Sequence, residues 1–153
     1  MEKITFLQNE LPRLLRTLDA NATGSWGVMN GQQMAEHMAE SISFATGNNN
    51  QPLHTPAEHV AKYKEFAMSD KEFKPNTKNA LMSETPLPVK KANMEEAVAE
   101  VEKELADFVS YFKEHKDATL TNSFFGDLNF EEWTHLLHKH ARHHLKQFGL
   151  IKD

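Results

Sequence analysis

The sequence of 153 residues contains no cysteine. This absence excludes a disulfide scaffold, a thiolate nucleophile, an iron–sulfur cluster and a zinc site with cysteine ligands. Positive charge is also in deficit, because 17 Lys+Arg stand against 22 Asp+Glu and give a formal net charge of -5. A chain without excess positive charge has no strong electrostatic attraction to the phosphate backbone of nucleic acid. We therefore expect no nucleic-acid partner.

Long apolar runs are missing as well. No stretch approaches the roughly 20 apolar residues that a membrane span requires, and the first residues, MEKI, lack the charged-then-apolar pattern of a secretory signal. The composition, 39% hydrophobic and 25% charged, is that of an ordinary globular domain. We therefore expect a single cytoplasmic domain over residues 1–153, with no membrane partner.

The chain does show helical periodicity. Apolar residues recur at three- and four-residue spacing in four segments, at about residues 4–18, 30–46, 93–114 and 130–148. Three of these segments follow an asparagine that can serve as N-cap, namely Asn30, Asn93 and Asn129. No segment shows a convincing two-residue alternation of a strand. The pattern predicts an all-α fold, most economically a four-helix bundle.

Two features interrupt this regular pattern. Pro12 lies inside the first apolar stripe, so we expect a kink or a helix start nearby. Residues 47–92 form a long connection between the second and third helices, in which Thr55 and Pro56 predict the start of a short helix. Connections of this length are usually crossovers or functional loops, and the bundle is therefore expected to have a long crossover between helices 2 and 3.

Histidine is abundant, with nine residues, and five of them lie between His135 and His144. At about 100° per residue, the apolar residues of the last helix define its core-facing side, and His140 and His144 lie on that side or at its margin. His135, His138 and His143 point to solvent or to the rim. The cluster therefore divides into two inward histidines and three bystanders.

His140 and His144 are four residues apart, so their imidazoles are expected about 5–6 Å apart on one face, where they can meet one metal ion. A third ligand must come from another helix, and His37 lies beside the apolar stripe of the second. Three neutral imidazoles without a fourth protein ligand describe an open site for zinc, nickel or another late divalent ion. The alternative is that each is a core histidine bonded to a neighbour. Glu36 and Glu40 flank His37 but lie off the core face, so we expect both to be exposed.

Two parts of the chain resemble a known family. Residues 140–147, HARHHLKQ, resemble the final-helix motif of the DinB-like (DinB/YfiT) superfamily, and residues 26–38 resemble its second helix. Residues 122–150 resemble more narrowly a branch known as a domain of unknown function. The resemblance implies a four-helix bundle in which His37, His140 and His144 bind a divalent metal, commonly nickel or zinc.

The same resemblance limits what can be said of the reaction. Leu145 and Lys146 stand where Arg-Gly often precedes the glutamine in the superfamily, so metal binding is carried over but a particular substrate is not. Characterised relatives include thiol-dependent S-transferases and a maleylpyruvate isomerase. If this chain uses a low-molecular-weight thiol, the thiol must arrive as co-substrate, because the chain has none.

These features give two hypotheses for function. The first is a metal-dependent enzyme of thiol S-transferase or hydrolase type that acts on a small-molecule substrate, with Gln147 orienting a ligand from outside the metal shell. The second is a non-catalytic, stress-related helical bundle that acts as a homodimer and whose metal is structural or absent. Trp26, Phe124 and Phe125 are expected either to line the mouth of a pocket or to plug the ends of the bundle.

Overall fold

The computed structural model describes residues 1–74 and 87–152 and is mostly helical, with 56% of residues in helices. In chain order the elements are α1 (Lys3–Thr5), the π-helical segment η1 (Phe6–Glu10), α2 (Leu11–Arg16), α3 (Gly31–Ser43), α4 (Ala57–Met68), α5 (Met94–Glu114), β1 (Leu120–Asn122), β2 (Gly126–Leu128) and α6 (Phe130–Gln147). The predicted helical fold is confirmed, apart from one small antiparallel sheet. Within the described ranges, no helix combines the length and apolar character needed to cross a bilayer.

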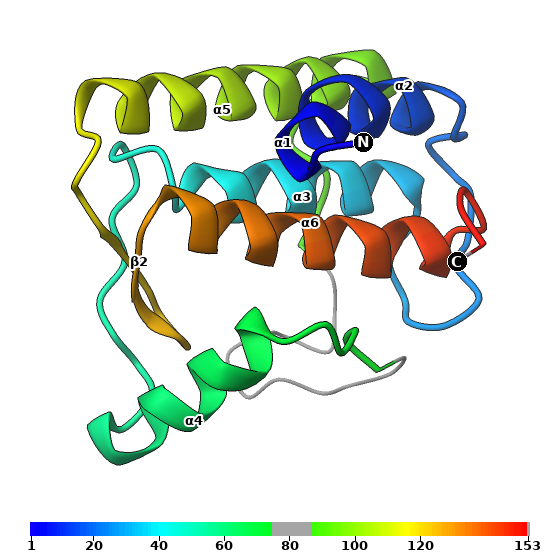
Figure 1. Ribbon diagram of the computed structural model, residues 1–153. Coiled ribbons are helices and arrows are strands. Elements are labelled where there is room, and N and C mark those ends of the chain that lie inside the picture. Colours follow the sequence, from blue (N-terminus) through cyan, green and yellow to red (C-terminus); the bar gives the residue numbers. More distant parts are fainter. Residues whose placement is uncertain (75–86, 153) are drawn as a thin grey trace.

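The long helices share one apolar core. In Figure 1, α5 and the N-terminal helix (α1, η1 and α2) form the upper part, α3 and α6 lie below them, and α4 lies beneath α6. α3 packs against α5 and α6, and the N-terminal helix contacts both α5 and α6. The largest fully buried side chains come from all of these elements: Leu7, Leu11, Leu15, Met34, Met38, Ile42, Val98, Leu105, Phe108, Trp133 and Leu145. This core fixes the position of α3 relative to α6.

Asparagine caps set the helix starts, as the sequence predicts. The side chains of Asn30 and Asn129 each accept a hydrogen bond from the backbone three residues on, and the Gln33 and Glu132 side chains each accept one in return from the backbone N–H of the cap residue. Such a capping box satisfies two backbone donors that a helix start would otherwise leave free. At the start of α5, the Asn93 side chain accepts a hydrogen bond from the Glu96 backbone N–H in the same way, without the reciprocal bond of a capping box. The caps therefore fix where α3 and α6 begin, and with that which residues face the core.

Pro12 produces the predicted irregularity. Proline has no N–H and its ring clashes with the carbonyl four residues earlier, so a regular helix cannot pass through it undisturbed. Here the preceding turn widens into the π-helical segment Phe6–Glu10, and the Leu11 N–H bonds to the Phe6 carbonyl five residues back. The helix continues to Arg16 with Leu7, Leu11 and Pro12 buried. The apolar stripe therefore survives across the irregular turn.

The long connection contributes α4, which begins one residue later than predicted because Pro56 is the N-cap. α4 contacts α6 and β2. The Lys139 side chain, only 5% exposed, donates a hydrogen bond to the Phe66 carbonyl near the end of α4. Part of the long connection, residues 75–86, lies outside the described residues. α4 and the residues that follow it thus cover one side of α6.

The β-hairpin is not predicted by the sequence analysis. Leu120 pairs with Leu128, and the indole N–H of Trp133 donates to the Leu120 carbonyl, which ties the hairpin to the first turns of α6. Phe124 and Phe125 lie half-buried in the turn. They are therefore at the start of α6, away from the end that carries His144.

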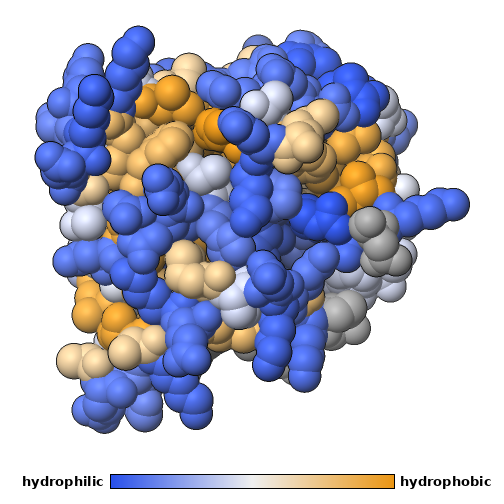
Figure 2. Space-filling view, in the orientation of Figure 1, coloured by the Kyte–Doolittle hydropathy of each residue, from blue (hydrophilic) through white to orange (hydrophobic). Residues whose placement is uncertain are grey.

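The face of the molecule in Figure 2 is mostly polar, with apolar side chains gathered in separate patches. The exposed apolar residues of the described chain include Tyr63 and Phe66 on α4, at 45% and 40% exposure. A mixed surface of this kind is normal for a globular protein.

Candidate metal centre

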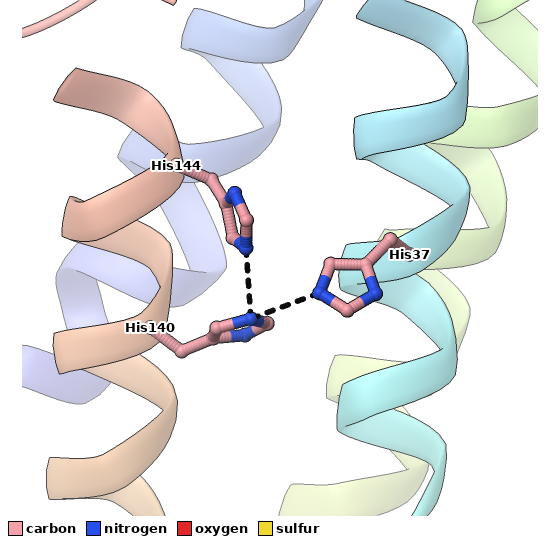
Figure 3. Close-up of side chains that lie close together, drawn as sticks. All are labelled: His37, His140 and His144. Atoms are coloured by element: carbon pink, nitrogen blue, oxygen red, sulfur yellow. Dashed lines mark hydrogen bonds between the residues drawn. The ribbon is translucent and has the colours of Figure 1, made fainter. Parts of the chain in front are cut away.

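Three imidazoles converge between α3 and α6, and they are the three that the sequence singles out. His37 comes from α3, and His140 and His144 come from successive turns of α6 (Figure 3). The Nε2 atom of His140 lies 3.0 Å from Nε2 of His37 and 3.0 Å from Nε2 of His144. In all three pairs the rings stand nearly perpendicular, with centroids 4.6–5.0 Å apart. The three rings therefore aim their nitrogens at one small volume.

The spacing of the nitrogens is close to what a metal ion requires. Zinc–imidazole bonds of about 2.0–2.1 Å in tetrahedral geometry place the nitrogens about 3.3 Å apart. One ring nitrogen from each histidine lies within 4.8 Å of the other two, and in the part of the chain that the structure describes no carboxylate joins this group. A shift of a few tenths of an ångström would bring His140 to tetrahedral spacing from both partners. The residues therefore fit an all-imidazole, three-ligand site.

Burial keeps these imidazoles neutral. Loss of hydration, with a smaller effect from nearby His143, lowers the pKa of His37 to about 4. Burial and then the neighbouring His37 lower the pKa of His144 to about 3, against a small opposing effect of Gln147. Burial and the two partner rings place the pKa of His140 well below its ordinary value. At neutral pH the cluster thus offers unprotonated nitrogen to a cation.

Access to the cluster is uneven. His144 is buried at 7% exposure, whereas His37 and His140 are partly buried.

Gln147 lies where the sequence places it, one turn beyond His144, and it is 3% exposed. Its Oε1 atom is 2.7 Å from Nδ1 of His144, and its Nε2 donates to the Trp26 carbonyl at 2.7 Å. From the sequence, Trp26 is expected either to line the mouth of a pocket or to plug an end of the bundle. The structure shows that its main chain holds Gln147, while its ring packs at 5.4 Å from the ring of His143.

The remaining six histidines stay outside the cluster. Three of them, His54, His59 and His115, are exposed.

The other three, His135, His138 and His143, which the sequence predicts to face solvent or the rim, are half-buried. Nε2 of His135 lies 2.9 Å from the Ser69 carbonyl, and Nδ1 of His143 lies 3.3 Å from the Phe73 carbonyl. The physical reason is that residues 69–73, which follow α4, dock against His135 and His143, while the ring of His138 packs against Phe6 with centroids 5.2 Å apart.

The two glutamates beside His37 have different environments. Glu40 is exposed, as predicted. Glu36 is partly buried, so the prediction of exposure is wrong for it; its carboxylate accepts hydrogen bonds from the backbone N–H groups of Lys90 and Lys91. It therefore anchors the chain that leads into α5, and it does not join the histidine cluster.

One of three comparisons with known proteins gives a match. The model of one family, the DinB superfamily, matches residues 4–148, nearly the whole chain. A search of curated proteins and a search of solved structures found no match. The matched range includes all three clustered histidines and Gln147. A match of this extent decides the family: the chain belongs to the DinB superfamily.

Proposed function

We propose that the protein binds one divalent transition-metal ion through Nε2 of His37, His140 and His144. The observation that carries this proposal is the convergence of three neutral, largely buried imidazole nitrogens from two helices on one point. Imidazole is a preferred ligand of late first-row ions, so nickel and zinc are the ions we expect. We also assign the arrangement of the N-terminal helix, α3, α5 and α6 to the four-helix-bundle class, with the crossover between α3 and α5.

The direct contacts between the nitrogens support a bound cation. Nε2 of His140 carries at most one hydrogen, yet it lies 3.0 Å from two other ring nitrogens. In the neutral state only one of these two contacts can be a full hydrogen bond. An ion that accepts all three lone pairs removes this conflict, and burial of the rings keeps those lone pairs free of protons.

We propose further that the site serves a metal-dependent enzyme of S-transferase or hydrolase type, which acts on a small-molecule substrate in the cytoplasm. A divalent ion held by three histidines acidifies a water or thiol ligand, or polarises a carbonyl. His37, His140 and His144 would hold the ion; His144 is buried at 7% exposure, and His37 and His140 are partly buried. Any thiol must come from a co-substrate, since the chain has no cysteine.

Metal analysis of protein purified without a histidine tag tests the binding proposal. After reconstitution with nickel or zinc and desalting, we expect one ion per chain in the wild type. His140→Ala and His144→Ala should abolish the bound metal, while His138→Ala, the same change on the same helix, should retain it. Wild-type protein that holds neither ion after reconstitution would refute the proposal and leave the non-catalytic bundle as the better hypothesis.

Catalysis requires a separate test. The reconstituted protein is assayed against a panel of low-molecular-weight thiols with electrophiles, and against esters and amides, with metal-stripped protein as the control. We expect an activity that disappears with the metal and returns on reconstitution. An activity that persists unchanged in metal-stripped protein and in His140→Ala would exclude the metal from the reaction.

A further inference from the structure

We infer that Gln147 is a positioning residue that fixes the tautomer of His144, and that the main-chain carbonyl of Trp26 fixes the orientation of Gln147. This inference rests on the proposed metal site for its consequence, but its structural claim concerns the protein without metal. The residues involved are the last turn of α6 and the loop at residues 24–27.

The orientation of the Gln147 amide follows from its two partners. A carbonyl oxygen can only accept a hydrogen bond, so the group facing the Trp26 carbonyl at 2.7 Å must be the NH₂ of the amide. Turning the amide over would set two oxygens against each other at that distance. The carbonyl end, Oε1, is therefore directed at Nδ1 of His144, 2.7 Å away. The bond to Trp26 thus determines what Gln147 presents to the histidine.

The tautomer of His144 follows in turn. Oε1 of Gln147 has no hydrogen to donate, so the 2.7 Å contact is a hydrogen bond only if Nδ1 of His144 carries the proton. A neutral imidazole has only one N–H, so a proton on Nδ1 leaves Nε2 without one. Its Nε2 therefore presents a lone pair toward His140 and the centre of the cluster. His144 is in the form that a metal ion needs before any metal arrives.

The proton in the middle of the metal-free cluster can then be assigned to His140. Because Nε2 of His144 is unprotonated, its 3.0 Å contact with Nε2 of His140 is a hydrogen bond only when His140 is the donor. His37 then faces this proton with its own unprotonated Nε2 at 3.0 Å. Of the three rings, His140 is the one whose proton must leave Nε2 when an ion binds.

The loop at residues 24–27 is shaped around Gln147. The Ser25 N–H donates to the Gln147 backbone carbonyl at 2.7 Å. A Cβ atom at Gly24 would lie 2.8 Å from Cγ of Gln147 and 2.9 Å from the Trp26 carbonyl oxygen, and one at Gly27, where φ is +79°, would lie 2.7 Å from the amide nitrogen. Only glycine allows this approach at both positions. The loop therefore closes on the amide from two sides and holds the acceptor that orients it.

Nitrogen-15 NMR of the histidine side chains in metal-free protein at pH 7.5 tests the tautomer directly. In the wild type we expect His144 as the Nδ1–H form and His140 as the Nε2–H form. Gln147→Leu removes the acceptor, so His144 should become a mixture of tautomers. Finding His144 as the Nε2–H form in the wild type would overturn the inference, and this decides the matter even if the leucine variant does not fold.

Zinc affinity, measured by competition with a chromophoric chelator, tests the consequence. Loss of a hydrogen bond to the far side of a ligating histidine usually weakens metal binding about 10- to 100-fold, and we expect this for Gln147→Leu. Gln147→Glu keeps an acceptor for Nδ1–H but lacks the NH₂ that reaches Trp26. It should therefore retain the tautomer and lose less affinity than Gln147→Leu, although its second oxygen would face the Trp26 carbonyl.

A role of Gln147 limited to holding the loop predicts something else, namely an equal loss of affinity in the leucine and glutamate variants. That result would refute the inference. Gln32→Leu is the matched control, because Gln32 is also a buried amide, at 7% exposure, but bonds to Glu36 and the Lys91 carbonyl. It should change neither tautomer nor affinity. If no variant and no wild-type sample binds zinc or nickel, the proposed function fails, while the NMR result still decides the tautomer.

Discussion

Acidification should destabilise the metal-free protein through the histidine cluster. The pKa values of His37 and His144 are lowered to about 4 and about 3, and that of His140 lies well below 6.5, mainly because burial removes hydration from the charged form. In the unfolded chain the same residues titrate near 6.5. Between pH 6.5 and 4 the unfolded state therefore binds more protons than the folded state. Stability must fall as the pH falls through that range.

The size of the effect follows from this difference. Lowering the pH from 7.5 to 5.5 stabilises the unfolded form of one such histidine by about 1.4 kcal/mol, because the unfolded ring becomes protonated and the folded ring does not. Three rings together give about 4 kcal/mol. Domains are typically stable by only about 5–15 kcal/mol, so the loss should be large relative to the total.

Urea denaturation of chelator-treated protein at several pH values between 7.5 and 5.5 measures the effect. His140→Leu leaves two histidines to take up a proton on unfolding, so the fall in unfolding free energy between pH 7.5 and 5.5 should be smaller by about 1.4 kcal/mol. His115→Ala, at an exposed histidine, should leave it unchanged. A free energy of unfolding that is flat over this range would show that the three rings are not buried as neutral imidazoles, and the reasoning would be wrong.

Other consequences can be checked individually. Zinc or nickel at a hundred times its dissociation constant should stabilise the wild type by about 2.7 kcal/mol, seen as a rise in melting temperature that is absent in His140→Ala; an equal rise in both would place the ion elsewhere. Asn129→Ala should cost about 1 kcal/mol in urea denaturation, because it removes the cap of α6; no measurable loss would contradict the role of the capping box. Lys139→Met removes the bond to the Phe66 carbonyl and the contact of the ammonium with the Phe66 ring at 5.0 Å, so α4 should be cleaved faster in limited proteolysis, while unchanged cleavage would mean that other contacts hold α4 on α6.

Much of the fold can be predicted from the sequence because its determinants are local. Asn93 and Asn129 mark helix starts, and the apolar periodicity that follows extends over many turns. The hairpin at residues 120–128 escapes prediction because each of its strands has three residues, too few to show alternation. It depends instead on a tertiary contact, the bond from Trp133 to the Leu120 carbonyl.

The candidate site likewise has features that the local sequence predicts and features that depend on tertiary contacts. Helical phase alone places His140 and His144 together, because both lie on α6. The half-burial of His135 and His143 cannot be read from phase, since it depends on α4 and residues 69–73 docking on the other side of the helix. The link between Gln147 and Trp26 joins positions 121 residues apart, and no local pattern indicates such a contact.

The histidine cluster joins two parts of the chain that are far apart in the sequence, which affects the entropy of the unfolded state. His37 and His140 are separated by 103 residues, and the segment between them includes α4, α5 and the hairpin. An ion bound to both rings is a reversible cross-link that closes most of the chain into a loop. Covalent closure of a loop of about 100 residues lowers the entropy of the unfolded state by an amount worth about 4.7 kcal/mol in the simplest chain model. Release of the ion would therefore remove this restriction on the unfolded chain, while the apolar core still holds α3 and α6 together in the folded one.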